Sequence, residues 1–137
     1  MEDSQGKKST KLQTGNQGEA LAVEHLLAKG YTILARNWRY QKAELDIIAQ
    51  RERTTVFVEV KTRRGLAYGY PEEGVTLAKQ KHLARGANAY VLLHDINNDL
   101  RFDIISIILI KGQTPDIKHI EDAFFPIGEG YWRRLKM

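Results

Sequence analysis

Two short apolar segments separated by a polar turn constrain the fold of this chain more than any other feature of its sequence. They have the sequences AELDIIA over residues 43–49 and TTVFVEVKT over residues 54–62. Both are rich in apolar residues that alternate with polar ones, which is typical of β-strands. The polar residues 50–54 between them are few enough for a hairpin loop, so the sequence predicts antiparallel strands over 44–49 and 55–62.

Acidic residues occupy both predicted strands at positions that should lie side by side. Alternate residues of a strand share one face, so Glu44 and Asp46 point the same way as Ile48. On the second strand, Glu59 shares a face with Lys61. A turn at residues 51–54 sets Asp46 opposite Glu59, with Cβ atoms about 4.5–5.5 Å apart, and like charges placed so are destabilising. This pair of carboxylates predicts a divalent cation between them.

A third acid, Glu19, lies in the apolar stripe of a predicted helix over residues 16–29 and should therefore point toward the sheet. Mg²⁺ prefers oxygen ligands and commonly binds through one or two carboxylates together with substrate phosphate. Lys61 would position a water and stabilise charge on a transferring phosphoryl group. The sequence therefore predicts a constellation of Asp46, Glu59 and Lys61 on a rigid hairpin, with Glu19 beside it.

A structural explanation of these charges stays open. Alternating charged residues on a strand commonly mark a face in contact with water, and Glu19 would favour its helix N-terminus by about 0.3–1 kcal/mol through the helix dipole. The predicted register also sets Glu44 opposite Lys61 and Ile48 opposite Phe57, so Glu44 and Lys61 can be an ordinary cross-strand ion pair. Against this explanation, the second strand is otherwise valine and phenylalanine, which indicates that it is well buried.

The rest of the sequence predicts one α/β domain in which helices flank a mixed sheet, with the element order α-β-β-β-α-β-(β). Residues 1–14 lack apolar periodicity and are expected to form a flexible N-terminal segment. Residues 15–126 form the domain, and residues 127–137 form a basic, aromatic C-terminal tail. Residues 63–74 hold several glycines, which predicts a loop. The predicted helices cover 16–29 and, capped by Thr76, 77–93; the predicted strands cover 31–38, 44–49, 55–62, 101–110 and 117–120.

Composition narrows the classes of protein that fit the chain. It has no cysteine, which excludes disulfide scaffolds, zinc ribbons and thiol nucleophiles. Residues 1–12 lack the apolar stretch of a signal peptide, and the longest apolar run, over residues 104–110, is too short to span a bilayer. These features predict a soluble, cytoplasmic protein with no membrane partner. They leave the oligomeric state open, with a homodimer among the options.

The charge balance admits a polyanionic partner such as nucleic acid. Lys and Arg together number 21 against 17 for Asp and Glu, and many of these cations lie between residues 36 and 64. Arg63 and Arg64 directly follow the second acidic strand. Lys79 lies in the first turn of its helix, where the dipole does not favour a cation. A phosphate contact would explain it, although a solvated lysine is the ordinary case. Tyr68 would either stack on an unpaired base or pack its loop onto the domain.

The order of these residues resembles the restriction-endonuclease-like superfamily, whose signature is an acid, a spacer and then (D/E)-x-K. The segments that carry the resemblance are Gly18-Glu19, AELDIIA and VFVEVKTR. More closely, the chain looks like the YraN family of small bacterial proteins, related to archaeal Holliday junction resolvases, from about Thr14 to Phe125. Two positions depart from the pattern: Ala43 stands where the family usually has glycine, and Leu45 where many superfamily members have proline.

The resemblance implies a restriction-endonuclease-like fold and a metal-dependent endonuclease that cleaves DNA phosphodiester bonds, with branched or damaged DNA among the substrates. It implies that Asp46 and Glu59 ligate Mg²⁺ or Mn²⁺ together with the carbonyl of Val60. Lys61 would orient or activate the attacking water, and Glu19 would complete the site. Two other functions stay open: a nucleic-acid-binding module that keeps the acids without turnover, and a structural or interaction protein in which the metal site serves only stability.

Overall fold

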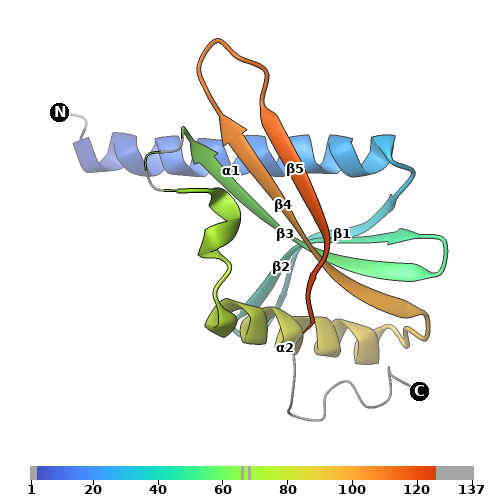
Figure 1. Ribbon diagram of the computed structural model, residues 1–137. Helices are drawn as coiled ribbons and strands as arrows, with labels where there is room; N and C mark the ends of the chain where they lie inside the picture. The colour runs from blue at the N-terminus through green and yellow to red at the C-terminus, as the bar shows by residue number, and fades with distance from the viewer. Residues whose placement is uncertain (1–2, 66, 68, 126–137) are drawn as a thin grey trace.

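A mixed five-stranded sheet, with strand order β1-β2-β3-β4-β5, lies between two helices (Figure 1). The computed structural model describes residues 3–65, 67 and 69–125 of the 137-residue chain. In chain order the elements are α1 (Asp3–Ala28), β1 (Thr32–Tyr40), β2 (Ala43–Arg51), β3 (Thr54–Arg64), the 3₁₀ helix η1 (Pro71–Gly74), α2 (Leu77–Leu93), β4 (Asp99–Leu109) and β5 (Asp116–Phe124).

The predicted element order is confirmed, including the last strand, β5. The pairs β1–β2, β2–β3 and β4–β5 are antiparallel, whereas β3 and β4 are parallel. Parallel neighbours require a crossover connection, and here the crossover consists of η1 and α2. The helix predicted over 77–93 has these bounds, and Oγ1 of its cap, Thr76, accepts a hydrogen bond from the Lys79 amide at 3.2 Å. No helix in the described part of the chain is long and apolar enough to cross a membrane.

The first helix begins at Asp3, well before the predicted start near residue 16, so residues 3–14 are helical and not the expected lead-in. In Figure 1, α1 runs along the whole width of the sheet. The end of β3 supports the early part of this helix, because Arg64 Nε donates a hydrogen bond of 2.7 Å to Thr14 Oγ1. Apolar periodicity could not reveal this helical segment, since polar contacts hold it in place.

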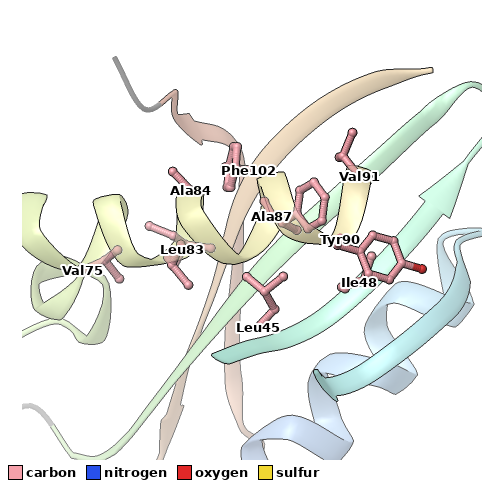
Figure 2. Packing of buried hydrophobic residues seen from close by; sticks show 11 residues of the cluster. Leu45, Ile48, Val75, Leu83, Ala84, Ala87, Tyr90, Val91 and Phe102 are labelled. Atoms are coloured by element: carbon pink, nitrogen blue, oxygen red, sulfur yellow. The ribbon is translucent and has the colours of Figure 1, made fainter. Parts of the chain in front are cut away.

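Two apolar cores lie on opposite faces of the sheet, one under each helix. Figure 2 shows the α2 side, where one stripe of the helix packs onto side chains of the strands. The buried residues on this side are Leu45, Ile48, Phe57, Val75, Leu83, Ala84, Ala87, Tyr90, Val91, Phe102 and Ile104. Those on the α1 side are Ala22, Leu26, Tyr31, Ile47, Ala49, Val56, Val58, Ile105, Ile107 and Leu109.

A close crossing between α1 and β3 sets the position of the helix. A Cβ atom added to Gly18 would lie 1.8 Å from Oγ1 and 2.8 Å from Cβ of Thr62. Only a glycine fits this contact without displacing one of the two backbones, because real Cβ contacts do not come so close. The crossing brings the next residue, Glu19, to the sheet at the level of the acidic strands.

The twisted ribbon formed by β1 and β2 is irregular: its register shifts between Ile33 and Ala35, and Asn37 has a positive φ of 50°. Ile47 packs in the α1-side core, while both Leu45 and Ile48 pack in the α2-side core. Strict alternation cannot place residues 45 and 48 on the same face, so the prediction that Glu44 shares a face with Ile48 is wrong. The alternation of side chains between the two faces of β2 is therefore interrupted at Asp46, between Leu45 and Ile47.

Candidate active site

β2 and β3 separate at the level of the predicted acidic pair. Their register sets Ile48 opposite Phe57 and Ile47 opposite Val58, as the four-residue turn predicts, but the paired residues end there. Beyond that point Asp46 Oδ2 accepts a hydrogen bond of 2.9 Å from the amide of Val60. The Asp46 carboxylate thus replaces the backbone carbonyl that a continued ladder would have supplied, and one edge of β3 remains open toward the cleft described below.

The expected cross-strand ion pair between Glu44 and Lys61 does not form. Glu44 Oε2 lies 3.6 Å from Arg39 Nε across the β1–β2 ribbon. Lys61 Nζ lies 3.8 Å from Glu59 Oε2, its neighbour on the same strand face. The separation of β2 from β3 explains both contacts, because it carries Glu44 away from the strand that bears Lys61.

Glu59 is the more deeply buried acid, with 4% of its side chain exposed. Its Oε2 lies near two cations, Lys61 at 3.8 Å and Lys79 at 3.5 Å, the latter reaching over from the first turn of α2. Its Oε1 is buried and has no hydrogen-bond partner within the described residues. A buried carboxylate oxygen without a partner is costly, so this atom is suited to a ligand that brings positive charge.

Asp46 is destabilised in its charged form. Burial raises its pKa, the charge of nearby Glu59 raises it further, and the hydrogen bond from the Val60 amide opposes both, so the pKa lies at about 8. The charge of Glu19 adds a smaller increase in the same direction. At neutral pH the pair of carboxyl groups therefore keeps a proton for much of the time, which a bound cation would replace.

Glu19 points from α1 toward the sheet, as predicted, with 16% of its side chain exposed. Its Oε1 accepts hydrogen bonds from Asn37 Nδ2 at 3.2 Å and from Arg36 Nη2 at 3.5 Å. Both partners lie on β1 at the twist described above. Sequence reasoning did not single them out for this role, since the positive φ of Asn37 brings them to Glu19 only in the folded chain.

These acids line a cleft of about 630 Å³ bounded by α1, β3 and the start of α2. Its walls combine carboxylates with a larger number of cations. The lining residues are Lys11, Thr14, Gly15, Glu19, Asp46, Glu59, Val60, Lys61, Thr62, Arg63, Arg64, Gly65 and Lys79. The structure thus brings together every predicted site residue except Tyr68, which lies outside the described residues.

The predicted nucleic-acid contacts have different surroundings. Arg63 Nε is buried without a hydrogen-bond partner in the described part of the chain. Arg64 hydrogen-bonds to Thr14 and, from Nη2, to Gln17 Oε1 at 3.4 Å, so it also joins β3 to α1. Lys79 is neither free nor simply solvated, because it forms the ion pair with Glu59. Lys11 and Thr14 also line the cleft, and sequence reasoning missed them because it predicted the helix only from residue 16.

The residues present fit a hard divalent cation in part. In the described residues there is no group of three or more His, Cys, Asp or Glu side chains placed to hold a metal. Asp46 and Glu59 supply two carboxylates, one of which has an unpartnered buried oxygen. The N–H and C=O of a strand residue point to the same edge, so the Val60 carbonyl belongs to the same open edge as its amide. Substrate and water would have to supply the remaining ligands.

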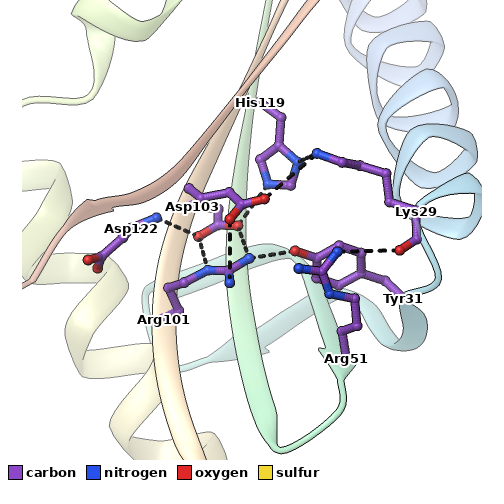
Figure 3. Close-up of polar contacts among 8 residues, drawn as sticks. Lys29, Tyr31, Arg51, Arg101, Asp103, His119 and Asp122 are labelled. Carbon is purple, nitrogen blue, oxygen red and sulfur yellow. Dashed lines mark hydrogen bonds and ion pairs between the residues drawn. The ribbon is translucent and has the colours of Figure 1, made fainter.

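A second buried polar network lies near the C-terminal end of α1, and none of its residues lines the cleft (Figure 3). Asp103 accepts both guanidinium contacts of Arg101 at 2.8 Å and a contact of 2.7 Å with His119 Nε2. Arg101 also donates to the Tyr31 hydroxyl at 2.5 Å. Because Asp103 is fully buried and its oxygens are satisfied, this network serves the packing of β4 and β5.

The fold and the cleft together define a class: an α/β domain with a buried carboxylate pair at an open strand edge, surrounded by cations. The particular family follows from comparison with known sequences. A family model described as uncharacterised protein family UPF0102 matches residues 18–107, and the chain belongs to this family.

Relatives from several bacteria match most of the chain. A UPF0102 protein of Flavobacterium psychrophilum is 47% identical over 111 residues, covering 81% of this chain and 92% of the relative. One from Caldicellulosiruptor saccharolyticus is 47% identical over 116 residues, covering 83% and 98%. One from Clavibacter michiganensis is 39% identical over 110 residues, covering 80% and 93%. Their names state the family and no activity.

Proposed function

We propose that this protein is a metal-dependent endonuclease that hydrolyses phosphodiester bonds of DNA, branched or damaged DNA included. The observation that carries the proposal is the buried pair of Asp46 and Glu59 in a cleft lined with cations. Two neighbouring carboxylates are costly at this depth even with Lys61 and Lys79 beside Glu59. An acidic centre in a basic cleft suits a metal-bound phosphate better than a free anion.

Mg²⁺ or Mn²⁺ would be held by Asp46, Glu59 and the carbonyl of Val60, and when bound it would neutralise negative charge on the phosphate. The unpartnered Oε1 of Glu59 supports this assignment. Asp46 has a second role that needs no metal: its bond to the Val60 amide keeps the edge of β3 open.

Lys61 is assigned to the reacting phosphate. Its ammonium group lies beside Glu59 and on the wall of the cleft, where it would orient the attacking water and stabilise charge that develops on the phosphoryl oxygens. In hydrolysis the water oxygen forms a bond to phosphorus, one ester P–O bond breaks, and the leaving oxygen gains a proton. Glu19, held by Asn37, would orient water at the other side of the acidic pair.

Binding of the polyanion is assigned to Arg63, Arg64 and Lys79, which surround the acids. Arginine presents planar donors that match phosphate oxygens, and contacts of this kind give DNA affinity that falls steeply with salt. Lys79 would exchange its pairing with Glu59 for the phosphate when a cation takes over that carboxylate.

The proposal is tested with a panel of linear, flapped and four-way DNA incubated with Mg²⁺, Mn²⁺ or EDTA. We expect cleavage only with a divalent cation, and loss of cleavage with retained DNA binding in Lys61→Ala, because the lysine acts mainly on the transition state. Lys111→Ala, which removes an exposed lysine outside the cleft, should leave cleavage unchanged. Equal cleavage by Lys61→Ala and wild type would contradict the assignment of Lys61.

A second candidate function is a nucleic-acid-binding module without turnover. The observation that favours it is that Lys11, Arg63 and Arg64 have no carboxylate partner in the described part of the chain, so they can bind a polyanion whether or not a metal is present. Wild-type protein that binds every DNA of the panel but cleaves none of them, with either metal, would support the module over the enzyme.

A further inference from the structure

The cations of the cleft fall into two groups that differ in whether an acid neutralises them. Lys61 and Lys79 both pair with Glu59. Lys11 and Arg64 line the same cleft, but neither has a carboxylate partner among the residues that the structure describes. Unpaired cations that converge on a concave surface favour an anion there, because they pay no cost of breaking an existing ion pair.

The cations carried by β3 lie on both of its faces. Lys61 and Arg63 lie against η1, since a Cβ added to Gly74 would be 3.8 Å from Lys61 Cε and 3.6 Å from Arg63 Nη2. Arg64 turns to the other face and hydrogen-bonds to Thr14 on α1. The open edge of β3 therefore has cations on both faces of the strand. Lys61, Arg63 and Arg64 all follow Glu59, so they lie between the acidic pair and the C-terminal end of β3.

Arg64, at the end of β3, and Lys11, on α1, line the cleft on the side of the first helix. The bond from Arg64 Nε to Thr14 and the weaker bond from Nη2 to Gln17 hold the guanidinium, while its Nη1 has no partner within the described residues. Lys11 is three residues before Thr14 and therefore lies on the same side of the helix. Both the lysine and the free guanidinium nitrogen can donate to one phosphate.

We propose that Lys11 and Arg64 form a second phosphate subsite, which binds the same DNA strand beyond the phosphate held at Asp46 and Glu59. This inference rests on the proposed DNA binding at the cleft and specifies the path of the strand: across the open edge of β3 toward α1. The helical segment that precedes residue 16 is then part of the binding surface, because it carries Lys11.

The experiment measures binding alone. Full-length protein in EDTA is titrated against a short fluorescein-labelled single-stranded DNA by anisotropy, at a series of NaCl concentrations, for wild type, Lys11→Gln, Lys11→Arg and Lys111→Gln. The slope of log affinity against log salt is negative, and we expect it to become shallower by about 0.7 in Lys11→Gln, the value for one lost phosphate contact on a single strand. The slope should be unchanged in Lys11→Arg, which keeps the charge, and in Lys111→Gln.

If Lys11→Gln has the same slope as the wild type, the proposed subsite is wrong. It is also wrong if the wild type does not bind DNA. An equal fall in Lys111→Gln also overturns it, since that result indicates a general effect of protein charge. Lys and Gln have similar helix propensities, and circular dichroism checks that α1 remains formed. Because binding is measured in EDTA, this test is separate from the nuclease proposal. A shallower slope in Lys11→Gln, with no cleavage by the wild type in Mg²⁺ or Mn²⁺, supports the subsite and contradicts the nuclease. Cleavage by the wild type, with an unchanged slope in Lys11→Gln, supports the nuclease and contradicts the subsite.

Discussion

Replacing Gly18 by alanine should push α1 away from the sheet. The added Cβ would meet Thr62 Oγ1 at 1.8 Å, and rotation of the threonine side chain cannot relieve the contact, because its own Cβ would still lie 2.8 Å away. One of the two backbones must therefore move. Overpacking of this kind costs about 1–3 kcal/mol, and we expect the upper half of that range because both elements are held by further packing on either side.

Gly15→Ala is the matched control in the same helix. A Cβ at Gly15 would have no atom within 4 Å outside its local surroundings, so this variant should show only the gain in helix propensity, about 0.8–1.0 kcal/mol. Gly18→Ala has the same gain together with the clash. The difference in unfolding free energy between the two variants isolates the clash, for which we expect about 2–3 kcal/mol.

Urea denaturation measures this difference as a change in the midpoint at constant slope. Thr62→Ala removes Oγ1 and Cγ2 and should recover part of the loss in Gly18→Ala, which appears as a coupling energy in the double-mutant cycle. If Gly18→Ala is as stable as Gly15→Ala, and Thr62→Ala shows no coupling to it, then the close crossing of α1 over β3 is wrong, and so is the placement of Glu19 that depends on it.

Three further predictions concern the charged groups. The raised pKa of Asp46 means that its ionisation lowers the stability of the fold as the pH increases from about 4 to 8. Asp46→Asn should therefore be more stable than wild type by about 1 kcal/mol or more at pH 7 without metal, and its melting temperature should lose most of the response to Mg²⁺. Clear destabilisation of the variant in EDTA would argue that the carboxylate is structural. Burial alone would raise the pKa of Asp103, but the contacts with His119 and Arg101 outweigh it and lower the pKa, so the carboxylate stabilises the fold above pH 4 and this stabilisation disappears as the pH falls below that value. Asp103→Asn should cost about 3 kcal/mol at pH 7 and should weaken the loss of stability at acidic pH measured by denaturation. An unchanged loss of stability at acidic pH would contradict this role. The Glu72 carboxylate holds η1 to β4, because its Oε1 accepts a hydrogen bond of 2.7 Å from Ser106 Oγ. Glu72→Gln removes this charge and should speed hydrogen exchange of the Val75 amide with little change in the global melting temperature. Unaltered exchange at Val75 would show that other contacts hold η1.

The order of elements and the bounds of α2 could be derived from the sequence, because both depend on local signals. Thr76 caps α2 where a cap was predicted, and the short turn after β2 sets Ile48 opposite Phe57. Alternation along β3 also places Phe57 and Val58 on opposite faces of the sheet, and in the fold they belong to different cores. Such features need only neighbouring residues, so a single sequence contains them.

The early part of α1 could not be derived in this way. Its residues have no apolar stripe, and Thr14 is tied to Arg64, fifty positions further along the chain. Helices in proteins gain most of their stability from tertiary packing, so a segment held by polar contacts with a strand end leaves no periodic signal. The consequence for function is that Lys11, on the wall of the cleft, was missing from the predicted site.

The chemistry of the candidate site was determined by the sequence through the identity of Asp46, Glu59 and Lys61, but their arrangement was decided by tertiary structure. A register argument extends the β2–β3 ladder through the acids and sets them directly opposite each other. In the fold the ladder stops at Ile47, and Asp46 bonds to the Val60 amide in place of a carbonyl. The physical reason is that α1 and α2 pack on opposite faces of a twisted sheet, so β2 and β3 separate where no local pattern could announce it.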